Sequence, residues 1–95
     1  MTGLPITKTD RARALWGHLE EELRKHPGEP VLIEEFRDTP RLKSLLTIVN
    51  GNLNATLRAM PGRVQAHMRN SYVRTETGIR HGDLWVVWYP EETAP

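Results

Sequence analysis

The chain has 95 residues, a formal net charge of +1 and no cysteine. A chain of this length builds one small domain, and the lack of cysteine excludes disulfides, thiolate metal sites and a cysteine nucleophile. The longest apolar run, Leu84–Tyr89, is far shorter than the roughly 20 residues that a membrane-spanning helix needs. Because the N-terminus also lacks the apolar core of a secretion signal, we expect a cytoplasmic protein with no membrane contact.

The small net charge hides a basic block in the middle of the chain. Residues 40–80 hold seven basic side chains and one acidic one, whereas residues 1–39 carry a net charge of −2 and residues 81–95 a net charge of −3. Local fields, rather than the total charge, decide whether a polyanion binds. The block favours nucleic acid as one candidate partner, and a solvated basic surface is the simpler alternative.

The first regular element that we predict is a long amphipathic helix, which follows a flexible arm at residues 1–8. Thr9 is a good N-cap, and Pro27 with Gly28 ends the helix near His26. Apolar residues recur at helical spacing and form one stripe, which consists of Ala12, Leu15, Trp16, Leu19 and Leu23. The stripe indicates a scaffold helix packed on the core, and a dimer interface is the alternative.

The middle of the chain predicts a short extended segment and then two short helices. The apolar run Val31–Phe36 lies between turn residues, which favours a strand, while Pro30 would also suit the first position of a short helix. The next helix covers residues 40–50, and its buried stripe is Leu42, Leu45, Leu46 and Val49. A short helix over residues 52–60 follows, with Leu53, Leu57 and Met60 inward and Asn54 and Arg58 outward.

After a turn at Pro61 and Gly62, residues 61–70 predict a second short helix with a polar outer surface. Val64, His67 and Met68 share one face, which makes His67 a packed histidine. The outward residues are rich in hydrogen-bond donors, and they are Arg63, Gln65, Arg69 and Asn70. Arginine pairs with guanine, and glutamine or asparagine with adenine, so this set suits base edges in the major groove. A solvated polar face is the alternative.

Residues 71–89 have the composition of a β-hairpin. Ser71–Thr77 is rich in β-forming residues, Gly78–Gly82 is a glycine-bounded loop, and Leu84–Tyr89 is a second strand that Pro90 ends. The basic residues of this hairpin are Arg74, Arg80 and His81. The second strand is apolar on both faces, so it needs cover on both. Residues 91–95 are expected to form a loose tail.

The sequence lacks the residue patterns of a catalytic or metal site. His18, His26, His67 and His81 form no closely spaced pair, and cysteine is absent, so we predict no metal site. Neither serine has the context of a nucleophile, and no glycine-rich phosphate loop is present. We therefore predict no catalytic residue, no cofactor and no enzymatic activity.

The segment Asn52–Tyr89 orders its predicted elements as helix, turn, helix and basic hairpin. This order, together with the placement of charge, resembles winged helix-turn-helix DNA-binding domains. The resemblance implies a single α+β domain over residues 9–90, with the helix-turn-helix at residues 52–70 and the wing hairpin at residues 71–89. The strand predicted near Val31 would be a third short strand of that fold.

The same resemblance implies a small bacterial or phage protein that binds double-stranded DNA, as a transcriptional regulator or a nucleoid-associated factor. A homodimer is one candidate assembly. Residues 61–70 would be the recognition helix, and Arg80 with His81 would form the wing tip. The predicted DNA contacts are Arg58, Arg63, Gln65, Arg69, Asn70, Arg74, Arg80 and His81. An alternative register makes residues 52–60 the recognition helix, with Asn54 and Arg58 as base readers.

A module that binds and modulates a host or partner protein is the alternative function. Its anchor residues would be Trp85, Trp88 and Tyr89, since tryptophan and tyrosine are enriched at binding hot spots. The simpler explanation, which we favour for at least two of the three rings, is that they close a small core. RNA binding through aromatic residues exposed on the sheet is a weaker hypothesis, because the chain lacks an aromatic-rich ribonucleoprotein motif.

Overall fold

The computed structural model describes residues 8–91, with side chains described from Ala14 onward. The elements in chain order are α1 (Lys8–Lys25), a 3-10 turn η1 (Glu34–Phe36), α2 (Leu42–Asn50), α3 (Ala55–Arg58), β1 (Arg63–Val73) and β2 (Arg80–Tyr89). The predicted α+β class is confirmed, as helices plus an antiparallel hairpin. Apart from Lys8 and Glu91, the predicted arm and tail lie outside the described residues. Within residues 8–91, no helix is long and apolar enough to cross a membrane.

β1 occupies the place of the second helix that the sequence predicts at residues 61–70, so that prediction is wrong and the helix-turn-helix at residues 52–70 does not form. The hairpin begins at Arg63 rather than at Ser71. Three alternate residues of β1 lie directly opposite apolar residues of β2. The pairs are Val64 with Trp88, Ala66 with Val86 and Met68 with Leu84. Pairing with this apolar strand outweighs the helical propensity of the segment.

β2 is the central strand, because it is hydrogen-bonded along both edges. β1 pairs with one edge, and on the other edge Val31 exchanges two backbone hydrogen bonds with Val86, at 2.7 and 2.9 Å. Thr39 makes the same exchange with Gly82, at 2.8 and 3.3 Å. The strand predicted at residues 31–36 is therefore reduced to one bridging residue followed by η1, and no helix begins at Pro30.

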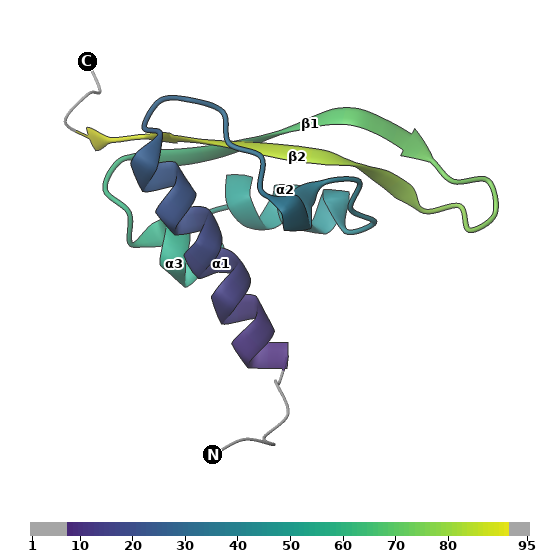
Figure 1. The fold of residues 1–95 in the computed structure, drawn as a ribbon, viewed down its shortest axis with the longest axis horizontal. Coiled ribbons are helices and arrows are strands. Elements are labelled where there is room, and N and C mark those ends of the chain that lie inside the picture. The colour runs from purple at the N-terminus through teal and green to yellow at the C-terminus, as the bar shows by residue number, and fades with distance from the viewer. Residues whose placement is uncertain (1–7, 92–95) are drawn as a thin grey trace.

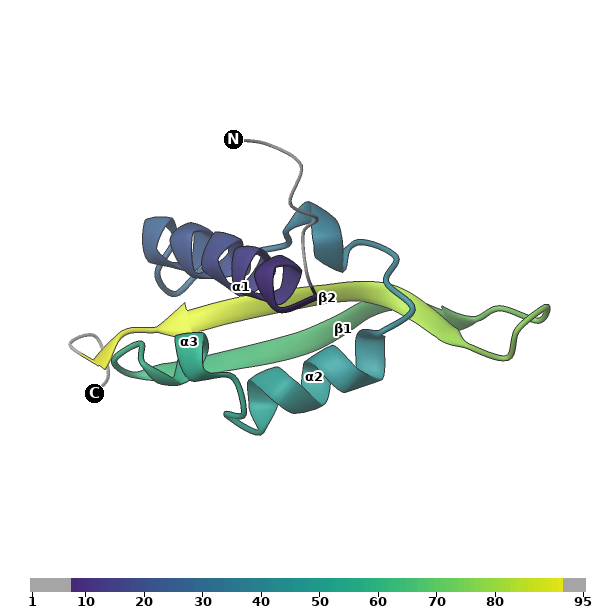
Figure 2. The same ribbon diagram turned by 90° about the horizontal axis from the view of Figure 1, so that it is seen from below.

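All three α-helices lie on one face of the hairpin (Figures 1 and 2). The helices contribute to the core Trp16, Leu19 and Leu23 from α1, Leu42, Leu45 and Val49 from α2, and Leu57 from α3. The hairpin contributes Ala66, Leu84, Val86 and Trp88, with Val64 packed beside them. In their described residues, the predicted apolar stripes of the first two helices are therefore confirmed. Leu53 was predicted to point inward, but it is exposed.

Asn50 fixes α2 against the outer edge of β1. Its side-chain Nδ2 donates to the carbonyl oxygen of Ala66 at 3.1 Å, and its Oδ1 accepts from the backbone N–H of Ala66 at 2.8 Å. The amide side chain satisfies both backbone groups of this residue, as a neighbouring strand would. The position of α2 is thereby tied to the register of the hairpin.

Gly62 sets the direction in which the chain enters β1, and only glycine fits there. Its φ is +105°, and an added Cβ would collide with the carbonyl oxygen of Tyr89 and lie 2.7 Å from the backbone nitrogen of Glu91. Gly62→Ala should lower the free energy of unfolding by roughly 2–5 kcal/mol, because backbone strain adds to overpacking. Urea denaturation measures this loss.

Gly17→Ala is the matched control. Gly17 lies within α1, and an added Cβ there meets nothing within 4 Å. This substitution should raise the free energy of unfolding by about 0.5–1 kcal/mol, since alanine restricts the unfolded chain and favours the helix. If Gly62→Ala proved as harmless as Gly17→Ala, the close approach at Gly62 would not constrain the hairpin.

Candidate functional site

Among the described residues, no helix or strand packs on the hairpin face opposite the helices, and we call it the outer face (Figure 1). From Arg63 to Arg69 on β1 and from Asp83 to Tyr89 on β2, strand alternation places the odd-numbered residues on it, since the even-numbered residues point towards the helices. The outer face consists of Arg63, Gln65, His67 and Arg69 from β1 and Asp83, Trp85, Val87 and Tyr89 from β2. Val87 is buried but does not belong to the core cluster. This agrees with its position on the outer face, where neighbouring side chains of that face cover it.

Three of the predicted DNA contacts lie together on the outer face, and they are Arg63, Gln65 and Arg69. The guanidinium carbon of Arg63 lies 5.4 Å from the centroid of the Tyr89 ring. His67 was predicted to pack on the inner face of a helix, but it is exposed on the outer face, opposite Trp85. One strand therefore carries an unbroken row of polar side chains that can donate hydrogen bonds.

Two of the three predicted anchor aromatics reach the outer face. Trp85 and Tyr89 are partly exposed there, whereas Trp88 points towards the helices and is 6% exposed. The indole Nε1–H of Trp88 donates to the carbonyl oxygen of Pro61 at 2.9 Å, and Arg24 lies 5.5 Å from its ring centroid. Trp88 is therefore a core residue. Its prediction as a partner anchor is wrong, because strand alternation turns it inward.

A hollow of about 250 Å³ lies beside Trp85 on the outer face. Its lining residues are Pro30, His67, Arg69 and Trp85. They come from three adjacent segments, since Pro30 directly precedes the bridge between Val31 and β2. Sequence reasoning missed Pro30 and His67 as parts of a site. The available signal was the two-residue apolar period at Val64, Ala66 and Met68, which sends His67 to the opposite face.

Three further predicted DNA contacts lie away from the outer face. Arg58 is exposed at the end of α3. Arg74 is the first residue of the hairpin turn and forms an ion pair with Glu76 at 3.4 Å. Arg80 donates a hydrogen bond to the hydroxyl of Ser71 at 3.2 Å.

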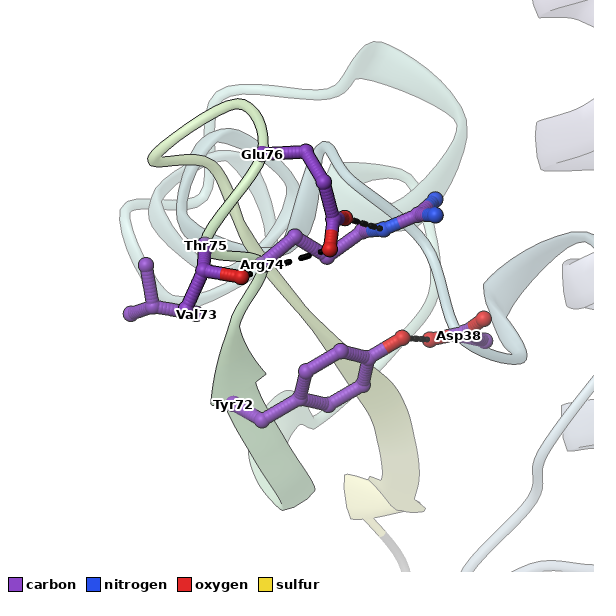
Figure 3. Close-up of a pocket in the computed structure, with 6 residues that line it drawn as sticks. All are labelled: Asp38, Tyr72, Val73, Arg74, Thr75 and Glu76. Carbon is purple, nitrogen blue, oxygen red and sulfur yellow. Dashed lines mark hydrogen bonds and ion pairs between the residues drawn. The ribbon is translucent and has the colours of Figure 1, made fainter.

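A polar cluster holds the projecting half of the hairpin to the loop before α2, and we call it the arm anchor. It consists of Asp38, Asn70, Tyr72, His81 and Asp83. The Asp83 carboxylate accepts from the backbone N–H of Asp38 at 2.8 Å and from Nδ2 of Asn70 at 3.0 Å. The Tyr72 hydroxyl donates to the Asp38 carboxylate at 2.8 Å (Figure 3), which raises the pKa of the phenol. The Tyr72 ring stacks on His81.

Two predicted DNA contacts belong to the arm anchor instead. His81 was predicted at the wing tip, but it is buried beside Asp38, and the turn lies at residues 74–79. The glycine after His81 marks close packing rather than a turn, since a Cβ on Gly82 would lie 2.9 Å from the Cα of Ser71. Asn70 adopts a left-handed conformation with φ +55° at a β-bulge, and its amide is engaged by Asp83.

A second hollow, of about 470 Å³, opens beside the arm anchor (Figure 3). Its lining residues are Asp38, Tyr72, Val73, Arg74, Thr75 and Glu76. The charged groups pair within the hollow, Arg74 with Glu76, and Tyr72 donates to Asp38. Within the described part of the chain, no group of three or more ligating side chains could hold a metal ion. The outer face is therefore the stronger candidate site.

No protein-family model, curated protein or solved structure matches the chain.

Asp83 gives the folding stability a pH dependence with a defined sign. The hydrogen bond from Asn70, followed by that from the backbone of Asp38, holds the pKa of the Asp83 carboxyl below its ordinary value of 3.8. The stabilisation is therefore complete above the unfolded-state pKa and is lost as the pH falls through the lower folded-state pKa. Urea unfolding between about pH 2.5 and about pH 7 should show Asp83→Asn less stable than the native chain at neutral pH, with the gap shrinking below about pH 4.

Glu76→Gln is the control, because Glu76 is an exposed carboxylate on the hairpin turn that lies outside the arm anchor. A gap between Asp83→Asn and the native chain that stayed constant from acid to neutral pH would contradict a role for the Asp83 charge.

Proposed function

We propose that the protein binds DNA and that the outer face of the hairpin, rather than a recognition helix, is the contact surface. The observation that carries the proposal is the row of Arg63, Gln65, His67 and Arg69 on one open face of β1. All four side chains can donate hydrogen bonds to phosphate oxygens or to base edges. Two of them are arginines, which favour phosphate and guanine as partners.

The spacing of this row would also suit a DNA duplex. Side chains two residues apart on a strand are separated by about 6.8 Å, which is close to twice the 3.4 Å rise of one base-pair step. The major groove is wide enough to admit a two-stranded β-ribbon. Neighbouring side chains of the row would then meet every second base pair or phosphate.

The charges on the outer face also support a polyanionic ligand. Among residues 14–91, neither Arg63 nor Arg69 takes part in an ion pair. Asp83 is the one carboxylate on the face, and its oxygens accept from the backbone N–H of Asp38 and from Asn70 without forming an ion pair with either arginine. The two arginines of the face are therefore left to attract phosphate, whereas Arg24 of α1 and Arg74 at the hairpin turn are paired with glutamate.

A winged-helix relationship remains part of the proposal. Its support is the element order, in which α1, the Val31 bridge to β2, α2, α3 and the hairpin follow one another. The element in the place of the recognition helix is α3, which has only four residues. Its N-cap Asn54 accepts a hydrogen bond from the backbone N–H of Leu57 at 3.1 Å, so the side-chain oxygen is engaged. In that register Arg58 is left as the reader. The proposed protein is a small bacterial or phage regulator or nucleoid-associated factor whose main contact surface is the outer face.

A salt titration tests the proposal and separates the two surfaces. Binding of the purified protein to a random-sequence duplex, followed by fluorescence anisotropy, should weaken steeply between about 50 mM and about 200 mM salt. Replacing Arg63 and Arg69 together by alanine should reduce the log–log slope by about 1.8, since each phosphate that is no longer neutralised removes about 0.9 from the slope.

Arg58→Ala is the matched control, since Arg58 is an exposed arginine on α3. It should leave both the affinity and the slope unchanged. A weakening confined to Arg58→Ala would move the DNA-binding surface to α3, and an absence of duplex binding at low salt would overturn phosphate contact altogether.

Protein binding through the same face is a second candidate function. Trp85, Val87 and Tyr89 alternate along β2 on the outer face, so an apolar centre lies beside the polar row. Such a centre with a polar rim is also the composition of a protein interface. Contacts dominated by aromatic burial would persist at about 0.5 M salt, where a contact with few phosphates largely fails.

A further inference from the structure

Trp85 carries a large aromatic ring that lies outside the hydrophobic core cluster. Its neighbours on β2, Leu84 and Val86, point to the other face and belong to the core cluster, whereas Trp85 does not. The ring is partly exposed and lines the hollow of about 250 Å³ with Pro30, His67 and Arg69. A flat ligand that entered the hollow would find one apolar wall and two donor side chains at its rim.

The chemistry of the rim favours a flat ligand attached to an anion. Arg69 has no ion-pair partner within residues 14–91, and Asp83, directly opposite it, is engaged by the arm anchor. His67 lies directly opposite Trp85 and is exposed. A planar group linked to a phosphate would place its ring on Trp85 and its charge near Arg69.

We infer that the hollow binds an unpaired nucleobase of a single-stranded nucleic acid, stacked on Trp85, with Arg69 at the adjoining phosphate. The inference rests on the proposed function, because Arg63 and Arg69 would hold the strand along the outer face. A base inside a duplex is covered on both sides by its neighbours and must leave the stack before a side chain can cover it. The outer face should therefore prefer single strands to duplexes.

Trp85, rather than Tyr89, is the stacking ring. Tyr89 lies on the same face, four residues further along β2, but the guanidinium of Arg63 already lies 5.4 Å from its ring centroid. That contact occupies one side of the phenol. The two aromatic side chains thus form a matched pair, in which one ring lines a hollow and the other is covered by an arginine.

The test compares a fluorescein-labelled single-stranded DNA of mixed sequence with the duplex of the same sequence, using anisotropy and the full chain. The single strand should bind about tenfold more tightly than the duplex, as one stacked base contributes. Trp85→Leu, which keeps an apolar side chain but removes the aromatic plane, should weaken single-strand binding by about 5- to 100-fold and duplex binding far less. Trp85→Phe should retain most of the affinity.

Tyr89→Leu is the comparison for general loss of aromatic surface on the same face, and it should weaken single-strand binding less than Trp85→Leu does. Quenching of tryptophan emission by the unlabelled strand gives a second readout, which does not depend on a variant that has lost binding. The quench should be strong in the native chain and nearly absent in Trp85→Phe, whose buried Trp16 and Trp88 remain. An RNA strand of the same sequence shows which sugar the face accepts, since stacking itself is open to both.

The outcomes separate the inference from the proposed function. Salt-sensitive duplex binding with no preference for the single strand, and an equal loss on both ligands in Trp85→Leu, would overturn the stacked base and leave DNA binding in place. If neither the single strand nor the duplex bound at low salt, both the stacked base and the proposed DNA binding would be overturned. If urea denaturation shows that Trp85→Leu does not fold, two other results still test stacking on Trp85. They are the preference of the native chain for single strands and the difference in tryptophan quenching between the native chain and Trp85→Phe.

Discussion

The register between β1 and β2 is the constraint on which the rest of the structure depends. With Ala66 opposite Val86, the even-numbered residues of Arg63–Arg69 and of Asp83–Tyr89 face the helices and the odd-numbered residues face away, as far as the bulge between Arg69 and Tyr72. A slip by one residue would exchange the two faces and bring the polar row of β1 into the core. Contacts from outside the hairpin hold this register, since Asn50 bonds both backbone groups of Ala66 and Val31 bonds both of Val86. The attachment of α2 to the hairpin and the register of the two strands therefore depend on each other.

Local spacing was enough to predict the α+β class, the apolar stripes of the first two helices and a C-terminal hairpin. It failed at residues 61–70, because Val64, His67 and Met68 suit a helical period, while Val64 and Met68 with Ala66 between them suit a strand. The same short segment satisfies both patterns, and the choice is made by β2, whose partner residues lie about 20 positions further along the chain. The sequence of residues 61–70 alone does not reveal this pairing with distant residues of β2.

The candidate site was predicted in part, for a similar reason. Arg63 and Arg69 remain on a polar surface whether the segment is a helix or a strand, because charged side chains avoid the core in either case. The roles of Trp88 and His81 depend on distant partners, Pro61 for the indole and Asp38 for the imidazole, and no local pattern reveals those contacts. Sequence reasoning grouped the three aromatics together, whereas strand alternation divides them between the core and the outer face.

That division separates the side chains that hold the core from those on which both proposals rest. Even-numbered side chains such as Ala66 and Val86 hold the helices, so their substitution disturbs the fold. Odd-numbered side chains such as Arg69 and Trp85 contribute little to the core, so their chemistry can be set by a ligand. The described helices all lie on one face of the sheet. The face left open carries a partly exposed indole and two arginines that form no ion pair within residues 14–91, and on that face both proposals depend.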